Sequence, residues 1–280
     1  MSQLNFHMTP RIHYLHPRHW YIELLFVAGI FAVVIGIIGA YWDIGWHFDY
    51  GRDGFWSPPH LFIYASIGIM ALFFLLCLII AGKQKLSRRA HVLFVLIILG
   101  IIGSATQYIA APIDELWHRL YGIEVQIMSF PHLLLIFGGA LGNIALIQII
   151  RYHVLHERRR FLIEKLLIPF FSGFLLAGLL LMFAESEFAT LPAWSPVTTR
   201  PLWVYPFFGL VFGTVVCLVA RRLTNFRWAA TMTIGCYTLI RAIPIAWNWW
   251  MGMHSIPVVP PFLLSLFGIA IVIDLLAQKQ

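Results

Sequence analysis

The chain has 280 residues, of which 60% are hydrophobic and only 11% are charged, and its mean hydropathy is +0.83. A water-soluble domain carries roughly a quarter of its residues as charged side chains, so this composition excludes an ordinary soluble protein and indicates lipid as the main solvent. The net charge of +7 does not indicate nucleic-acid binding, because the basic residues lie in short segments between apolar runs and form no continuous stripe.

Residues 1–19 are not expected to be a signal peptide, because the apolar run that follows is too long and lacks a cleavage motif. They are predicted to form a cytoplasmic N-terminal segment, because the positive-inside rule applies to Arg11 and Arg18. Eight apolar runs follow, each about 20 residues long, as a helix needs to cross a bilayer. We expect Pro112 and Pro244 to kink or end their helices. The predicted fold is an all-α, polytopic membrane protein with about eight transmembrane helices. The candidate spans are residues 20–46, 59–82, 91–117, 131–150, 162–186, 201–220, 228–250 and 258–276.

Lysine and arginine are unequally distributed between the two sides of this topology. The N-terminal segment, the connections after the second, fourth and sixth runs, and the C-terminus hold 15 of the 19 basic residues. The positive-inside rule places these segments, and therefore both termini, in the cytoplasm. The predicted location is the inner membrane of the cell. The opposite, periplasmic side collects eight of the 12 acidic residues together with five histidines. We therefore expect the functional site near the external face.

Two external segments, residues 42–64 and 113–136, match each other. Both contain Asp-x-x-Trp-His, a glycine four residues after the histidine, and Pro-His-Leu at the head of the next apolar run. This match predicts a chain built from helical-hairpin repeats. The recurring residues are Asp43, Trp46, His47, Gly51 and His60 in the first segment, and Asp114, Trp117, His118, Gly122 and His132 in the second.

Residues 20–150 are therefore predicted to form a metal-binding half, and residues 151–280 a second helical half that is a degenerate repeat. Counting back from Pro201-Leu202 places Glu185 and Ala189 at the carboxylate and first histidine positions of a third copy. Counting back from Pro261-Phe262 places Ile245 and Trp249 there in a fourth copy. The second half would thus keep the scaffold and lose the ligands.

The spacing of each trio suits a metal ion. Asp and His four residues apart lie on one face of a helix, and a proline in the first turn of the next helix brings the second histidine to the same membrane depth. A carboxylate and two imidazoles leave coordination positions open, which suits copper, iron or zinc. The alternative is a set of interfacial polar side chains that contact water and loop backbone. The predicted ligands are Asp43, His47 and His60 in the first site and Asp114, His118 and His132 in the second.

The first segment resembles the C subunit of the copper-containing membrane monooxygenases, the particulate methane and ammonia monooxygenases. That family shows Asp-x-x-Trp-His, then Arg-Asp, then Pro-x-His. Its second pattern resembles the second trio, with Asp114 where the family commonly has Asn. The resemblance covers about residues 25–150 and indicates a divergent relative, since four candidate spans follow. The residues that match the first pattern are Asp43, Trp46, His47, Arg52, Asp53, Pro58 and His60.

The resemblance implies copper at both sites, ranked ahead of iron or zinc. For an enzyme it implies oxidation of a small apolar substrate with dioxygen, with electrons from partner subunits or a quinol, because the chain shows no second redox centre. We also expect an oligomer in the lipid bilayer. The alternatives are a non-catalytic copper storage or delivery protein, and a scaffold with vestigial sites.

Three further features complete the sequence-based predictions. Arg52 and Asp53 are predicted to orient His47 or His60, with a purely structural ion pair as the alternative. Arg241 lies inside an apolar span and needs an acidic partner, for which Glu185 and Glu187 are the candidates. A soft-ligand cluster that suits Cu(I) is predicted to load copper, with ordinary interfacial side chains as the alternative. This cluster consists of Met251, Met253 and His254.

Overall fold

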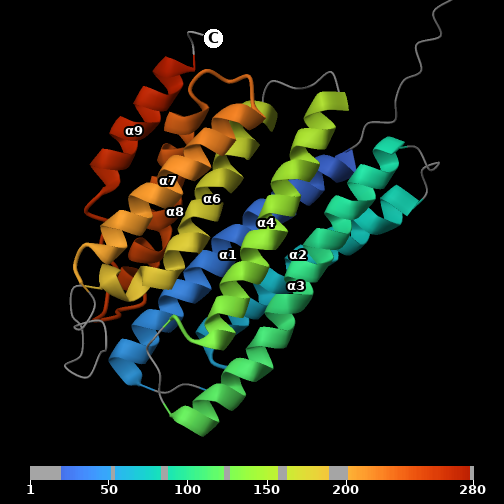
Figure 1. Cartoon of the computed structure of the whole chain (residues 1–280). Helices are drawn as coiled ribbons and strands as arrows, with labels where there is room; N and C mark the ends of the chain where they lie inside the picture. The colour runs from blue at the N-terminus through green and yellow to red at the C-terminus, as the bar shows by residue number, and fades with distance from the viewer. Residues whose placement is uncertain are drawn as a thin grey trace, which may run out of the picture.

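A computed structural model of the chain describes residues 20–51, 54–82, 88–122, 127–156, 163–188 and 201–277. Within these ranges the protein is all-helical apart from one isolated bridge between Phe188 and Pro257. The helices lie side by side in one bundle, with α2 and α3 on one side and α7 and α9 on the other (Figure 1). Arg52 and Asp53 lie outside the described residues, so their orienting role stays a prediction.

The first half contains four long α-helices. The second half begins with an α-helix that is preceded by a π-helical turn and followed by a 3₁₀ helix. The first four are α1 (Trp20–Tyr50), α2 (Pro58–Gly82), α3 (Arg88–Tyr121) and α4 (Phe130–His156). The changing helix consists of the π-helix η1 (Ile163–Leu167), α6 (Ile168–Leu180) and the 3₁₀ helix η2 (Leu181–Glu187). The last three are α7 (Val204–Leu223), α8 (Ala229–Trp250) and α9 (Leu263–Leu276).

Seven helical segments among the described residues are long and apolar enough to cross a membrane. The chain is therefore a multi-pass membrane protein in a lipid bilayer. The expected eighth span corresponds to α9, which has 14 residues. At 1.5 Å per residue α9 is about 21 Å long, whereas the hydrocarbon core is about 30 Å thick. The count of eight spans and the side on which each terminus lies stay predictions.

The two prolines do not end their helices. α3 continues through Pro112 to Tyr121, and α8 continues through Pro244 to Trp250. A proline inside a helix removes one backbone hydrogen bond, and neighbouring helices in a membrane protein can compensate for that loss. Of the two expected outcomes, ending the helix is thus excluded at both positions.

Close backbone contacts at glycines pair the helices of the first half. A Cβ atom on Gly103 of α3 would lie 2.6 Å from the carbonyl oxygen of Gly138 on α4. A Cβ atom on Gly39 of α1 would lie 2.9 Å from the backbone nitrogen of Ile63 on α2. Helices in lipid depend on such close packing, because burying apolar side chains away from apolar lipid provides little driving force. Packing therefore joins the helix pairs that carry the two motifs.

α6 connects the two halves. Its Phe171 belongs to a buried apolar cluster with residues of α1 to α4, and Leu176 and Leu180 belong to a second cluster that joins residues of α1 and α4 to residues of α7, α8 and α9. A Cβ atom on Gly173 would lie 2.7 Å from the backbone nitrogen of Tyr237 on α8. α6 is thus held tightly against the second half while it presents another face to the first.

Arg241 finds its acidic partner in Glu187. Its Nη2 atom donates to Glu187 Oε2, and the relative exposures of the two side chains are 2% and 0%. Tyr205 donates its hydroxyl proton to the other carboxylate oxygen of Glu187, and the guanidinium lies 3.8 Å from the centroid of the Tyr41 ring. Of the two expected partners, Glu187 is confirmed by this contact. Glu185 instead accepts a hydrogen bond of 2.7 Å from the backbone nitrogen of Ile127, just before α4.

Candidate metal centre

The first trio converges where α1 ends and α2 begins. Asp43 and His47 lie one turn apart near the end of α1, and His60 lies in the first turn of α2. Asp43 Oδ1 lies 3.2 Å from His60 Nε2. Asp43 Oδ2 lies 3.9 Å from His47 Nε2. One carboxylate thus faces the Nε2 atoms of two imidazoles.

The second trio repeats this arrangement where α3 ends and α4 begins. Asp114 Oδ1 lies 3.2 Å from His132 Nε2, and Asp114 Oδ2 lies 3.5 Å from His118 Nε2. In each trio the three potential ligand atoms lie within 4.8 Å of one another. The structure therefore brings together all six residues that the sequence proposes as ligands.

These separations are compatible with a bound metal ion. Metal bonds to histidine nitrogen and carboxylate oxygen are about 2.0–2.2 Å long, so two ligands of one ion lie at most about 4.4 Å apart. The carboxylate–histidine separations of 3.2–3.9 Å lie within this limit. The Oδ1 atoms of Asp43 and Asp114 are buried and accept no hydrogen bond among the described residues. Each carboxylate therefore has a lone pair available for a cation.

The other ring nitrogen of each histidine contacts an oxygen. His47 Nδ1 lies 3.1 Å from the carbonyl oxygen of Gly51, and His118 Nδ1 lies 3.3 Å from that of Gly122. His60 Nδ1 lies 3.2 Å from the carbonyl oxygen of Gly54. A carbonyl oxygen only accepts, so in these three rings Nδ1 donates and Nε2 is the atom available to a metal.

The glycine that recurs in both motifs has a structural reason. Gly51 and Gly122 adopt φ values of 80° and 87°, which L side chains rarely adopt and which commonly end a helix. Each glycine accepts its histidine's Nδ1 proton on the carbonyl and donates its own N–H to that histidine's carbonyl, at 3.2 Å for Gly51 and 3.0 Å for Gly122. The helix terminus thereby fixes the orientation of the imidazole.

Two orienting residues were missed by the sequence reasoning. Gly54 holds His60, and the hydroxyl of Ser129 lies 2.8 Å from His132 Nδ1. The signal for Ser129 was present in both motifs, because a serine precedes each second histidine by three residues: Ser57 before His60 and Ser129 before His132.

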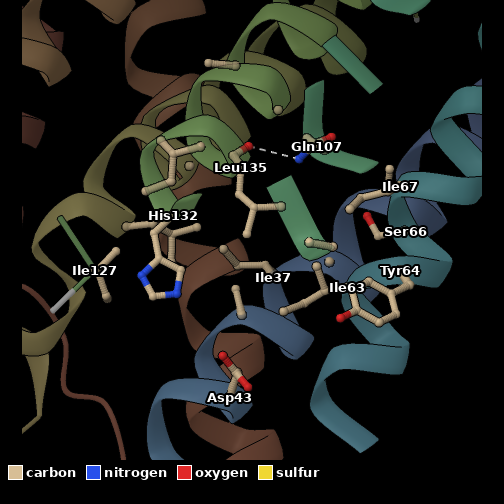
Figure 2. A pocket seen from close by; sticks show the side chains of 18 of the residues that line it. Ile37, Asp43, Ile63, Tyr64, Ser66, Ile67, Gln107, Ile127, His132 and Leu135 are labelled. Atoms are coloured by element: carbon tan, nitrogen blue, oxygen red, sulfur yellow. Dashed lines mark hydrogen bonds between the residues drawn. The ribbon is translucent and has the colours of Figure 1, made fainter. Parts of the chain in front are cut away.

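The two trios lie next to each other. The ring centroids of His47 and His118 are 5.9 Å apart, and those of His118 and His132 are 6.0 Å apart. Residues of both trios line one cavity of about 180 Å³. Figure 2 shows Asp43 from α1 and His132 from α4 pointing into this cavity.

The cavity continues away from the trios between apolar walls. α6 contributes Phe174, Leu175 and Gly178, and η2 contributes Leu181, although neither helix carries a motif. The polar side chains in this part of the wall come from other helices; they are Ser66, Gln107 and Asn143. Gln107 donates its amide proton to the carbonyl oxygen of Leu135, as Figure 2 shows.

The proposed copper-loading residues lie on the loop after α8. The backbone nitrogens of His254 and Ser255 donate to Asp49 near the end of α1, at 2.7 Å and 3.0 Å. Met253 is buried, whereas Met251 and His254 are exposed. The thioether of Met253 is therefore buried away from the surface to which Met251 and His254 are exposed. The copper-loading role of the three residues stays a prediction.

α8 ends with the spacing seen at the two motif helices. Gly252 adopts a φ of 70° and follows Asn248 by four residues, with Trp247 directly before Asn248. Alignment on this glycine pairs Asn248 with His47 and His118, whereas counting back from Pro261 pairs Trp249 with them, and the fourth copy of the repeat stays a prediction. The side chain of Asn248 donates to the carbonyl oxygen of Tyr41, at 3.2 Å.

Comparison of the sequence with protein-family models found no match. No curated protein and no solved structure matched the chain. Its function is therefore inferred from its own residues and their geometry.

Proposed function

We propose that this membrane protein binds copper at two adjacent Asp-His-His sites and is a divergent relative of the C subunit of the membrane monooxygenases. The observation that carries the proposal is the convergence of two histidine Nε2 atoms on each of two buried carboxylates, Asp43 and Asp114. The six proposed ligands are Asp43, His47, His60, Asp114, His118 and His132.

A bound metal ion accounts for the way in which the Nε2 atoms face the carboxylates. Because Nδ1 of His47, His60 and His118 donates to a carbonyl, each Nε2 lone pair would face a carboxylate lone pair unless a cation or a second proton lay between them. A metal ion at each trio would lie between the carboxylate and the two Nε2 atoms and would bind the lone pairs of all three groups.

Copper is proposed ahead of iron and zinc because of the motif resemblance. Two imidazoles and one carboxylate alone suit copper, iron or zinc. Arg-Asp after the first histidine, at Arg52 and Asp53, and the spacing of the second trio add the specific likeness to the copper proteins. In the proposed topology both sites lie near the periplasmic face, in an oligomer within the inner membrane.

The shared cavity favours an enzyme over a storage or delivery protein. A storage site needs ligands but no chamber for an organic molecule, whereas the cavity here extends from the trios between apolar side chains such as Ile63 and Leu135. Apolar walls with few polar groups are typical of small-molecule sites. The proposed reaction is oxidation of a small apolar substrate with dioxygen, with electrons from partner subunits or a quinol.

Elemental analysis of protein purified from membranes grown with copper, iron and zinc tests the metal. We expect about two copper ions per chain, and X-ray absorption should report nitrogen and oxygen neighbours without sulfur. Copper together with oxidation of a hydrocarbon or ammonia supports the enzyme. Copper without turnover, when a quinol is supplied, supports storage or delivery. Protein without metal after copper loading contradicts the proposal.

A further inference from the structure

We propose that the cavity binds a slender molecule with an apolar body and one hydrogen-bond donor, with the donor at the end remote from the trios. The simplest such ligand is a straight-chain primary alcohol of about five to seven carbons. This ligand is the substrate class of the copper sites proposed above, and only its oxidation at the metal rests on that proposed function. The binding itself requires no metal.

The volume limits the ligand's size. An apolar cavity of about 150 Å³ holds one benzene molecule, and this cavity has about 180 Å³. It therefore suits a molecule with about six to eight non-hydrogen atoms. Its lining is mainly apolar, including Ile37, Ile67, Ala140 and Phe174, so most of that molecule must be hydrocarbon.

The lining residues make the cavity elongated along the helices. Asn143 follows His132 by 11 residues on α4, which corresponds to about 16 Å along the helix axis. Gly36 precedes Asp43 by seven residues on α1, or about 10 Å. The cavity thus reaches from the helix ends, where the trios lie, towards the middle of the bundle.

The deep end offers a hydrogen-bond acceptor. Asn143 is 3% exposed, and its Nδ2 atom donates to the carbonyl oxygen of Phe171 on α6, at 2.7 Å. Because that carbonyl only accepts, the bond fixes which amide atom faces Phe171. Asn143 Oδ1 is buried and has no hydrogen-bond partner among the described residues. A buried amide oxygen without a partner is costly, and a donor on the ligand would remove that cost.

Two other polar side chains near this part of the wall donate to backbone carbonyls. The hydroxyl of Ser66 donates to the carbonyl oxygen of Ala32, at 2.7 Å, and Gln107 Nε2 donates to the carbonyl oxygen of Leu135, at 3.1 Å. The hydroxyl proton of Ser66 and one amide proton of Gln107 are thus used within the protein, whereas Asn143 Oδ1 has no partner among the described residues. This acceptor favours a ligand with a hydroxyl or N–H group over an alkane. An alcohol bound in this way presents its methyl end towards the trios.

Gly178 on α6 provides a way to fill the cavity. It lines the wall, and a Cβ atom built on it meets no heavy atom within 4 Å. A leucine at this position would project into the cavity and occupy the ligand's space. Gly235 on α8 is a matched control, because a Cβ atom there also meets nothing within 4 Å and this residue does not line the cavity.

Photolabelling in lipid nanodiscs tests the proposal. The probe is a six-carbon primary alcohol that carries a diazirine, and mass spectrometry locates the labelled peptides. We expect label on α4 and α6 peptides around Asn143 and Phe174. 1-Hexanol should protect these peptides about tenfold better than hexane at equal concentration in the bilayer, which is the effect of one buried hydrogen bond. The same result is expected for metal-free protein.

The variants separate the two parts of the proposal. Asn143→Leu should weaken protection by 1-hexanol about tenfold and leave protection by hexane unchanged, Gly178→Leu should abolish cavity labelling, and Gly235→Leu should have no effect. Label spread over lipid-facing peptides, or equal protection by hexane and 1-hexanol in the unmodified chain, would overturn the inference. If Asn143→Leu fails to fold, the comparison of hexane with 1-hexanol in the unmodified chain still tests the inference. Labelling of the cavity in a protein that never binds copper would keep this inference and reject the metal function.

Discussion

His47 and His118 lie with ring centroids 5.9 Å apart, although they end different helices of different hairpins. Each belongs to its own trio, and each is oriented by a glycine at positive φ. The two sites are therefore neighbours in space.

Replacing two ligands of one site tests the assignment of the trios. The double variant His47→Ala/His60→Ala should lose about half of the bound copper, because it removes both imidazoles of the first trio and leaves the second intact. His91→Ala is the control, since His91 is an exposed histidine at the other end of α3 and belongs to neither trio. Elemental analysis of equal amounts of purified protein measures the loss, and full copper content in the double variant would refute the first site.

The distance between the sites predicts magnetic coupling. In protein loaded with two Cu(II) ions per chain, electron paramagnetic resonance should show spectra broadened by spin–spin interaction. The variant His118→Ala/His132→Ala retains one ion and should give the sharper spectrum of an isolated Cu(II) ion. A spectrum of fully loaded protein that equals the simple sum of the two single-site variants would show that the ions lie too far apart for this arrangement.

The positive φ of Gly122 predicts a loss of stability on substitution. Gly122→Ala should destabilise the protein by about 1–2 kcal/mol, because an L side chain is strained in the left-handed region. It should also weaken copper binding at the second trio, since the carbonyl that orients His118 would move. Gly122→Asn should be milder, because asparagine tolerates this conformation better.

Gly235→Ala is the matched control for this substitution. Gly235 lies inside α8 with open space at its Cβ position, and it is not among the residues with positive φ. Thermal unfolding in one detergent and copper titration measure both effects. Equal stability of Gly122→Ala and Gly235→Ala would contradict the conformational explanation.

The buried pair of Arg241 and Glu187 predicts non-additive stability effects. Arg241→Met alone should destabilise the protein by about 3–5 kcal/mol, because it leaves a buried carboxylate without its partner. Adding Glu187→Gln should recover much of this loss, since the pair is then uncharged and the new amide oxygen still accepts from Tyr205.

The exposed pair of Arg119 and Glu115 provides the control. Its atoms Nε and Oε1 lie 2.7 Å apart, but the Arg119 side chain is 67% exposed, so Arg119→Met should cost less than about 1 kcal/mol. Unfolding curves of the variants measure these differences. A double variant as unstable as the sum of its single variants would argue against a coupled pair.

Much of the local structure was predictable because it depends on residues close in sequence. Apolar runs long enough to span a bilayer predicted the helices, and the four-residue spacing of Asp43 and His47 predicted a shared helix face. The glycines at 51 and 122 were visible as a repeat, but their role in holding Nδ1 of a histidine required the backbone conformation. The sequence predicted Glu185 or Glu187 as the partner of Arg241, and the packing of the helices brings Glu187 into contact with it.

The sequence by itself determined that the chain lies in lipid and that its helices cross the bilayer. It also determined which six side chains can act as ligands, because hydropathy and short spacing are local properties. Only the tertiary structure decided that the two trios adjoin, that α6 walls their common cavity, and that Asn143 leaves an acceptor in it. These relationships depend on the order in which helices pack against each other. That order is set by close contacts such as Gly103 against Gly138 and Gly173 against Tyr237, which join helices whose positions in the sequence do not reveal that they touch.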